Sequence, residues 1–181
     1  EAHQLPDGRW SAVVDTEEGW EHNDVGVTGL ALLALMGAGR GPSTPAVARG
    51  IGWLLANQSS TTGEMPSSKE AHDWIYSHLL ATLALGEAQA LRPSPAVKDR
   101  LALAVEVIFA AQNPEAGWRY ESPPMGESDT SVTALAVAAL FAARAAGIEA
   151  HVETAFEGAR NYIDKVTEPG SGRIGYSALG E

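Results

Sequence analysis

The chain has 181 residues, no cysteine and a formal net charge of −11 at pH 7. The absence of cysteine excludes disulfide frameworks, thiolate metal sites and cysteine nucleophiles, and the acidic balance argues against a nucleic-acid partner. The longest charge-free run, Val25 to Gly39, is too short for a bilayer, which takes about 20 residues. We therefore expect a globular protein with no nucleic-acid partner, no membrane span and no cofactor.

A glycine-centred motif recurs along the chain at a nearly constant spacing. Its copies are centred on Gly8, Gly63, Gly117 and Gly172, which lie 55, 54 and 55 residues apart, and a glutamine precedes the first three. Such self-similarity is typical of helical repeat arrays. We expect a single domain over 1–181, with a half-repeat at 1–20 and three repeats at 21–65, 66–120 and 121–176. Because the chain begins with Glu1 rather than methionine, we also expect it to be a piece of a longer protein.

Each period predicts two helices. The first helix of each pair is expected over 24–39, 74–91 and 129–147, and the second over 45–58, 95–112 and 149–166. The pairs Thr44-Pro45 and Ser94-Pro95 are typical of an N-cap residue followed by proline in the first turn. No segment shows a strand pattern, so the fold class predicted is all-α.

The two helices of each pair differ in kind. The second helices carry an apolar stripe opposite charged residues, which indicates that one face of each is exposed to solvent. The first helices are apolar nearly all round, as in the charge-free stretch from Ser131 to Ala143, and should be buried on every side. We expect an inner row of apolar helices backed by an outer row of amphipathic ones, with the Val25 and Val132 segments away from water. Three hairpins would make a partial α/α toroid whose open ends favour self-association or further repeats.

One stretch carries a family resemblance. It reads Arg49-Gly50-Ile51-Gly52-Trp53-Leu54-Leu55-Ala56-Asn57-Gln58, with Gly63 following. This resembles the Gln-Trp repeat of squalene–hopene cyclases and related terpene cyclases, whose superfamily includes protein prenyltransferase β-subunits. The sequences of residues 76–85 and 110–120 also resemble those of bacterial proteins that are known only for carrying prenyltransferase and squalene-cyclase repeats and whose activity is uncertain. The resemblance implies an α/α toroid in which the glutamine closes the outer helix.

The resemblance also directs attention to the start of the third inner helix. Class II terpene cyclases protonate an alkene with the middle aspartate of an Asp-x-Asp-Asp-Thr motif, and the matching stretch here runs from Gly126 to Thr130. Ser128 stands at the place of the acid, and a serine cannot supply a tuned carboxylic acid. The zinc triad of prenyltransferases needs a cysteine and is absent. Asp129 is expected to cap the helix, and the remaining catalytic candidates are Asp129, Glu127 and Asp73.

Aligning the inner helices on Thr28, His78 and Thr133 brings polar residues upstream into equivalent places: His22, His72 and Glu127. Helix caps and solvated loop ends are the first interpretation, with a metal ion or an acid–base site as alternatives. His78, inside an apolar helix, is predicted to be a hydrogen-bonded core residue that could also reach a site. The residues predicted to bind a ligand are Trp20, His22, Asp24, His72, Trp74, His78 and Tyr120.

From these patterns we expect a non-catalytic binding or interaction module that uses a concave, aromatic-lined cleft. Its ligand would be apolar, a peptide or a sugar, and a protein partner or a second copy is also expected. The alternative is an enzyme domain, either a degenerate terpene-cyclase-like fragment or a carbohydrate-active one. A cytoplasmic and an extracytoplasmic location both fit the composition.

Overall fold

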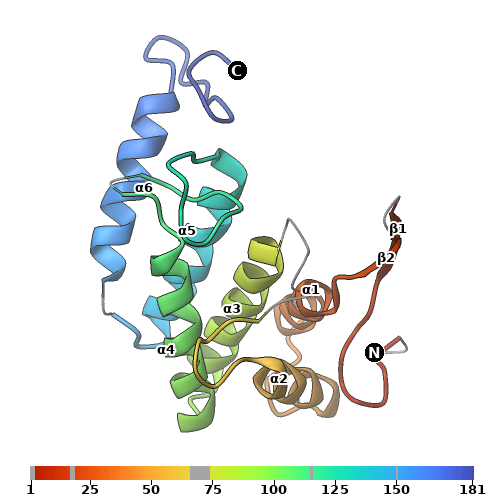
Figure 1. The fold of residues 1–181 in the computed structure, drawn as a ribbon. Helices are drawn as coiled ribbons and strands as arrows, with labels where there is room; N and C mark the ends of the chain where they lie inside the picture. The colour runs from red at the N-terminus through yellow and green to blue at the C-terminus, as the bar shows by residue number, and fades with distance from the viewer. Residues whose placement is uncertain (1–2, 17–18, 66–73, 115, 150) are drawn as a thin grey trace.

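The computed structural model describes residues 3–16, 19–65, 74–114, 116–149 and 151–181, with backbone only for 13–16 and 19–22 (Figure 1). Within these ranges there are six helices and one small antiparallel hairpin, so the all-α prediction is confirmed in class. The elements are β1 (Val13–Thr16), β2 (Gly19–His22), α1 (Asp24–Gly37), α2 (Pro45–Asn57), α3 (Trp74–Leu91), α4 (Pro95–Ala110), α5 (Thr130–Ala145) and α6 (Val152–Val166).

The hairpin corrects the prediction that the chain has no strand. Val13 pairs with His22 and Thr16 with Gly19 in antiparallel register. Each strand has only four residues, too few for an apolar–polar alternation to stand out in the sequence. The two adjacent valines at the start of β1 were the available β-propensity signal.

The helix boundaries follow the sequence closely. α3 begins and ends at the predicted residues, and the other five helices begin and end within three residues of theirs. Pro45 and Pro95 are the first residues of α2 and α4. Proline suits this position because it has no backbone N–H, and an N–H in the first turn has no partner within the helix. Thr44 and Ser94 stand at the N-cap positions, as predicted, but neither side chain makes a cap hydrogen bond. Thr44 instead donates its hydroxyl to the carbonyl oxygen of Gly41.

Three helices, α1, α3 and α5, form what we call the central row. α3 packs between α1 and α5, while α2, α4 and α6 flank the row as the second members of the three helix pairs (Figure 1). The approach is close: a Cβ added to Gly29 would lie 2.9 Å from the Leu80 carbonyl and the Ala81 nitrogen. One added to Gly86 would lie 2.9 Å from the Ala142 Cβ. Small residues therefore let the backbones of the row nearly touch.

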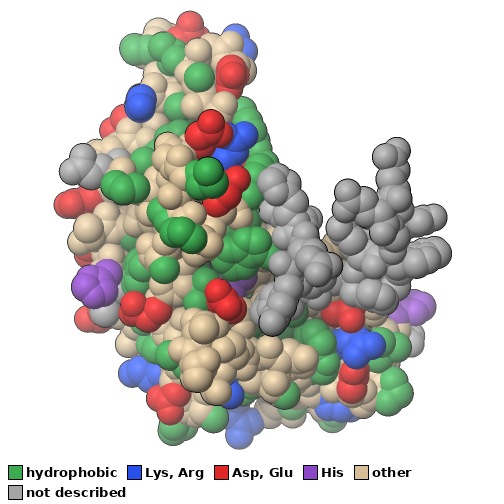
Figure 2. All heavy atoms as spheres, viewed as in Figure 1, with side chains coloured by type: hydrophobic (Ala, Val, Ile, Leu, Met, Phe, Trp, Pro, Cys, Tyr) green, Lys and Arg blue, Asp and Glu red, His purple; other side chains and the backbone are tan. Residues whose placement is uncertain are grey.

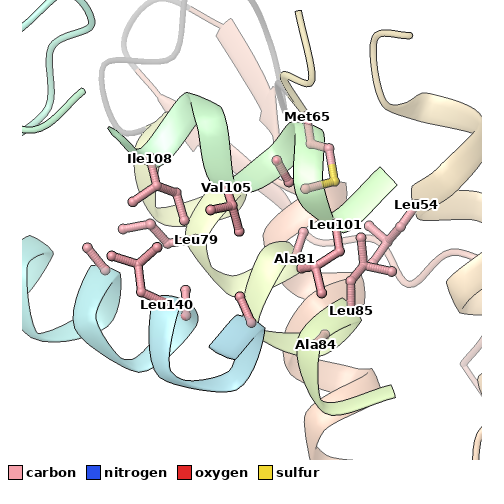
Figure 3. Close-up of a cluster of buried hydrophobic side chains, with 14 of the residues drawn as sticks. Leu54, Met65, Leu79, Ala81, Ala84, Leu85, Leu101, Val105, Ile108 and Leu140 are labelled. Carbon is pink, nitrogen blue, oxygen red and sulfur yellow. The ribbon is translucent and has the colours of Figure 1, made fainter. Parts of the chain in front are cut away.

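The core lies where α3 meets its neighbours (Figure 3). Leu79 and Leu85 of α3 are fully buried, together with Leu101 and Ile108 of α4 and Leu140 of α5. α3 carries apolar residues on opposite sides. This pattern suits its position, because neighbouring helices cover both of those sides. Val25 and Val132 are buried as predicted.

The prediction that the first helices are buried on every side is wrong at the two ends of the row. Leu30 of α1 is 51% exposed and Phe141 of α5 is 57% exposed. The reason is that α1 and α5 each have a central-row neighbour on one side only, within the described part of the chain. The sequence pattern shows that these faces are apolar, but it does not show that no further helix covers them.

One side-chain bridge occurs three times. The amide nitrogen of Gln58 donates to the carbonyl oxygens of Gly63 and Arg100, both at 2.9 Å, and so ties its own connecting loop to the next flanking helix. A primary amide has two N–H groups, so one glutamine can make both bonds. The same bridge joins Gln4 to Gly8 and Ala46, and Gln112 to Ala116 and Ala155.

A second contact recurs at the central row. The residues used to align the first helices each accept a backbone N–H from the preceding loop. Trp10 donates to the Thr28 hydroxyl at 3.0 Å and Trp118 to the Thr133 hydroxyl at 3.1 Å. In the middle pair Met65 donates to Nδ1 of His78 at 3.3 Å. Three loops thus enter the row in the same way.

The face shown in Figure 2 carries scattered acidic side chains, with lysine and arginine standing singly or in small groups among them. This distribution agrees with the net negative charge and offers no continuous basic stripe on that face. Among the helices of the described residues, none combines the length and the apolar character needed to cross a membrane.

The close contact at Gly29 makes a direct prediction. Replacing Gly29 with alanine should lower the free energy of unfolding by about 1–3 kcal/mol, because the new methyl group would overlap the α3 backbone. The matched control is Gly37→Ala in the same helix, where nothing lies within 4 Å of the added Cβ. It should be neutral or stabilise the helix slightly. Urea denaturation of both variants measures this, and equal stabilities would contradict the packing described.

Candidate functional site

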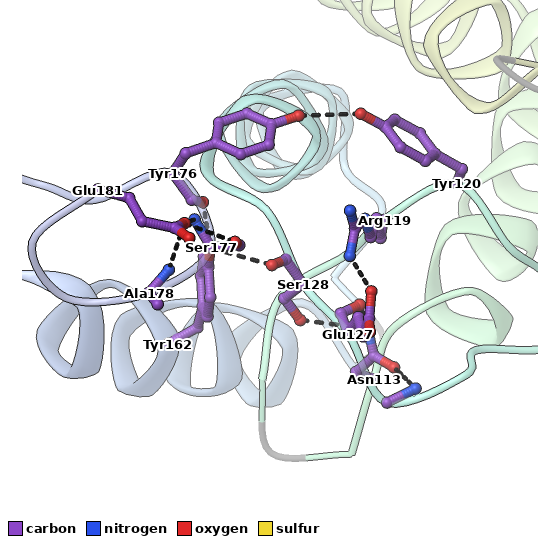
Figure 4. A network of polar contacts seen from close by, with 11 residues as sticks. Asn113, Arg119, Tyr120, Glu127, Ser128, Tyr162, Tyr176, Ser177, Ala178 and Glu181 are labelled. Atoms are coloured by element: carbon purple, nitrogen blue, oxygen red, sulfur yellow. Dashed lines mark hydrogen bonds and ion pairs between the residues drawn. The ribbon is translucent and has the colours of Figure 1, made fainter.

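All four tyrosines of the chain gather around the N-terminus of α5, and we call them the tyrosine cluster: Tyr76, Tyr120, Tyr162 and Tyr176. The Tyr76 hydroxyl lies 2.6 Å from the Ser131 hydroxyl, and the rings of Tyr76 and Tyr120 are 6.1 Å apart. The hydroxyls of Tyr120 and Tyr176 lie 2.9 Å apart (Figure 4). Tyr162 donates to the carbonyl oxygen of Tyr176 at 2.6 Å. Loops and helices distant in sequence are joined by these contacts.

Asp129 lies at the base of this cluster and is fully buried. Its Oδ1 accepts hydrogen bonds from the Val132 N–H and the Ser131 hydroxyl, both at 2.8 Å, so its predicted role as the cap of α5 is confirmed. Its Oδ2 has no hydrogen-bond partner among the described residues. Because Ser131 donates to Asp129, it accepts from Tyr76, and a hydrogen-bond chain runs from the Tyr76 hydroxyl to the buried carboxylate.

The negative charge of Asp129 acts on the tyrosines around it. Burial raises the pKa of Tyr76 and of Tyr162, and the Asp129 carboxylate raises both further. The hydrogen bond with Tyr176 raises the pKa of Tyr120, with smaller contributions from burial and from Asp129. The three phenols are therefore neutral near pH 7 and can donate hydrogen bonds there.

The loop that leads into α5 is held by Asn113, a buried side chain. Its amide nitrogen donates to the Glu127 carbonyl and to the Ser128 hydroxyl, while its amide oxygen accepts from the Gly126 N–H (Figure 4). The guanidinium of Arg119 forms an ion pair with Glu127 across the same loop. The backbone of this loop is therefore fixed by side-chain hydrogen bonds although it has no regular structure.

The C-terminal loop closes over the start of α5. The Thr130 N–H donates to the Tyr176 carbonyl at 2.9 Å, and the Thr130 hydroxyl donates to the Gly175 carbonyl at 2.7 Å. Further along, the Glu181 carboxylate accepts from the Ser177 hydroxyl at 2.7 Å (Figure 4), and this hydrogen bond lowers the pKa of Glu181. Tyr176 is thus positioned against Tyr120 by backbone contacts.

A polar pocket of about 540 Å³ opens beside the cluster, between the loop before α5 and helix α6. Tyr162, Ser128 and Val166 are its buried members, while Arg119 and Lys165 bring positive charge and Glu127 negative charge to it. The complete lining is Pro114, Ala116, Arg119, Gly126, Glu127, Ser128, Asn161, Tyr162, Lys165, Val166 and Ser177.

Three of the residues predicted from the sequence lie together. The indole N–H of Trp74 donates to the Tyr120 carbonyl at 2.9 Å, and the rings of Trp74 and His78 are 5.9 Å apart. Trp74 and Tyr120 are half-buried beside the tyrosine cluster. His78 is fully buried beneath them, so it supports Trp74 rather than facing solvent.

His78 is a core histidine, as the first interpretation predicted. Its Nδ1 accepts from the Met65 N–H, so its Nε2 carries the proton and donates to the Ala104 carbonyl at 2.9 Å. Burial lowers the pKa of His78 to about 4, against the opposing effects of the Ala104 hydrogen bond and the charge of Glu64. The imidazole is therefore neutral at physiological pH.

The other candidates do not join this group. Asp24 lies at the start of α1, where it pairs with Arg9 and accepts from the Ser11 hydroxyl. Glu127 is engaged by Arg119. The predicted positions His72 and Asp73, and the side chains of Trp20 and His22, lie outside the described residues. In the part of the chain that is described, no three histidine, aspartate or glutamate side chains gather closely enough for a metal ion.

Sequence reasoning did not select Tyr76, Ser131, Tyr162 or Tyr176 for the site. A signal was available for two of them, because Tyr76 and Ser131 each stand two residues before the alignment positions His78 and Thr133. Equivalent places on adjacent helices of one row lie side by side, which is where their hydroxyls meet. Tyr162, on α6, and Tyr176, in the C-terminal loop, meet because that loop folds back over the start of α5, and no spacing rule predicts that.

No family model matches the sequence, and no curated protein or solved structure matches the chain either. The resemblance to terpene cyclases therefore stays a prediction from the residues alone.

The buried His78 predicts a specific pH dependence. The folded state disfavours the protonated imidazole, so its contribution is present above the unfolded pKa of about 6.5 and is lost as the pH falls towards 4. Between pH 7 and pH 5 this amounts to about 2 kcal/mol of unfolding free energy. In His78→Gln, which cannot titrate, the loss over this interval should be smaller by that amount. Urea midpoints of both proteins at several pH values measure it, and parallel pH profiles would contradict it.

Proposed function

We propose that this protein is a non-catalytic binding module whose ligand contacts the tyrosine cluster and the polar pocket beside it. The observation that carries the proposal is the convergence of all four tyrosines on one helix N-terminus, with their rings half-exposed or exposed at three of the four positions. Tyrosine combines a flat apolar ring with a polar hydroxyl, and such side chains are enriched at binding surfaces.

We infer that the three helix pairs are copies of one unit, arranged as part of an α/α toroid of the terpene-cyclase-like kind. The glutamine bridge and the loop-to-row hydrogen bond, each made three times at equivalent positions, support this inference. In such an arrangement the loops that enter the central row meet at one end, which places the tyrosine cluster at that mouth.

The chemistry of the surface favours a sugar over an isoprenoid. Arg119, Glu127 and Lys165 offer charged donors and acceptors at the pocket, while Tyr176, a residue that is 43% exposed, offers an aromatic ring on which a pyranose ring can stack. A long isoprenoid needs an extended apolar cavity. The mainly apolar hollow lies elsewhere, between α5 and α6, and measures about 370 Å³.

The test is a titration of the protein with oligosaccharides, with proline-rich peptides and with long-chain isoprenoids, followed by calorimetry or NMR. Oligosaccharide binding should be saturable and should weaken by at least about tenfold, or about 1.4 kcal/mol, in Tyr176→Ala and in Tyr120→Ala. The control Leu179→Ala alters an exposed residue of the same terminal loop and should bind normally. Binding of isoprenoids alone, or wild-type affinity in both tyrosine variants, would overturn the proposal.

A second candidate is an acid–base enzyme domain, either terpene-cyclase-like or carbohydrate-active. The hydrogen-bond chain from Tyr76 through Ser131 to Asp129 favours it, because such a chain can move a proton between a surface hydroxyl and a buried carboxylate.

Asp129→Asn separates the two functions, because asparagine still caps a helix while it removes the charge. If the domain is an enzyme, turnover of an isoprenoid or an oligosaccharide should fall at least about 100-fold in this variant with folding preserved. If it is a binding module, no turnover is seen and ligand affinity changes little. Product analysis by mass spectrometry decides between them.

A further inference from the structure

The central row ends in two exposed faces whose own residues are uncharged, although the Arg144 guanidinium lies 4.8 Å from the centre of the Phe141 ring on one of them. On α1 and its C-cap residue we name the leading face, formed by Val27, Leu30 and Ala31 of the helix and by Ala38 directly after it. On α5 we name the trailing face, formed by Ser131, Ala134 and Phe141. Leu30, Ala38 and all three trailing-face residues are exposed, and Val27 and Ala31 are half-buried. Water contact with this much apolar surface is unfavourable.

The contacts inside the row show how such faces fit together. In the α1–α3 contact, Gly26 and Gly29 approach Ser77, Leu80 and Ala81. In the α3–α5 contact, Gly86 approaches Ala142 and Ala143. Each helix therefore presents one set of positions to the helix that follows it and another set to the helix that precedes it.

The leading face of α1 occupies the positions that α3 and α5 use to contact the preceding helix. Counted from Thr28, His78 and Thr133, Ala31 corresponds to Ala81 and Ala136, each three residues later. Both of these alanines are fully buried, whereas Ala31 is only half-buried. By the same count Ala38 is exposed where Ala88 and Ala143 are buried.

The trailing face of α5 occupies the positions that α1 and α3 use to contact the following helix. Ala134, one residue after Thr133, corresponds to Gly29 and Leu79, which are buried, while Ala134 is exposed. Phe141, eight residues after Thr133, corresponds to Met36 and Gly86, which are buried as well. Ser131 and Ala134 are small enough to admit a close helix, as Gly26 and Gly29 do in α1.

We propose that a second copy of this chain packs the leading face of its α1 on the trailing face of α5, so that the central row continues from one copy into the next. The proposed contact is continuous with the two contacts already made inside the chain and uses the same helix positions. The apolar hollow between α5 and α6, with Phe156 and Ile163 in its lining, lies beside the trailing face and would receive the flanking helix α2 of the second copy. The inference rests on the proposed repeat but not on ligand binding.

Such an interface is heterologous, because each copy uses two different faces. A ring of two copies satisfies both faces of each chain, whereas an open row leaves one face free at each end. The net charge of −11 makes the copies repel one another, although Arg144 brings one positive charge to the edge of the trailing face. Association should therefore strengthen as salt screens the repulsion.

The first test measures the mass of the 181-residue chain by light scattering against protein and salt concentration. We expect a dimer that dissociates on dilution and is favoured by salt. Leu30→Glu, on the leading face, and Ala134→Glu, on the trailing face, should each be monomeric. The control Ala96→Glu, an exposed alanine at the start of the flanking helix α4, should dimerise like the parent. All three positions are exposed, so each variant should fold like the parent, and circular dichroism checks this.

The second test mixes the two monomeric variants. Leu30→Glu keeps an intact trailing face and Ala134→Glu an intact leading face, so an equimolar mixture should form a heterodimer through one interface. Native mass spectrometry with one variant isotopically labelled detects it. A parent chain that stays monomeric at about 100 µM in high salt would overturn the proposal, as would a Leu30→Glu variant that dimerises alone. Neither result would alter the oligosaccharide titration of the tyrosine site.

Discussion

The near-contact of backbones between α1, α3 and α5 is the constraint on which the rest of the structure depends. Gly26, Gly29 and Gly86 allow it, because any larger side chain there would meet the neighbouring helix at less than 3 Å. Helices this close have little freedom to slide, since their side chains interlock at short range. Equivalent residues of adjacent helices are therefore held at the same level, and Tyr76 can reach Ser131. The chemistry at the mouth of the row is a consequence of small residues within it.

The sequence predicted the helices well because their signals are local. Proline at the start of α2 and α4, and apolar runs without charge in α1 and α5, identify helices without knowledge of their neighbours. The burial of Val25 and Val132 followed from the same runs. Open ends were expected from three hairpins, but the exposure of Leu30 and Phe141 in particular depends on which side of α1 and of α5 has no neighbouring helix. The β1–β2 hairpin was missed because strands of four residues give too short a pattern.

The candidate site was predicted in part for a related reason. Asp129 as a cap and Tyr120 near the mouth follow from their positions relative to α5, and His78 as a core residue follows from its apolar surroundings. The partners that give the site its chemistry come from elsewhere: Tyr162 from the last helix and Tyr176 from the loop after it. Those contacts depend on how loops without periodicity fold back, and hydrophobic patterns carry no information about that.

At the N-terminal end of the molecule, the loop contacts of the first helix pair are present, but the apolar face of α1 has no neighbouring helix. The segment with Gln4 and Trp10 makes the same contacts to α2 and α1 that the later loops make to the following pairs, so the entry to the first pair is fully formed. No helix of the described residues precedes α1 in the central row, however, and its apolar face is left uncovered. The N-terminal segment thus supplies the hydrogen bonds of a connecting loop, and unpaired backbone groups are costly to bury. It does not supply a central-row helix before α1, so the apolar face of α1 stays exposed. At this end of the row the loop contacts are therefore complete, whereas no helix of the described residues covers the apolar face of α1.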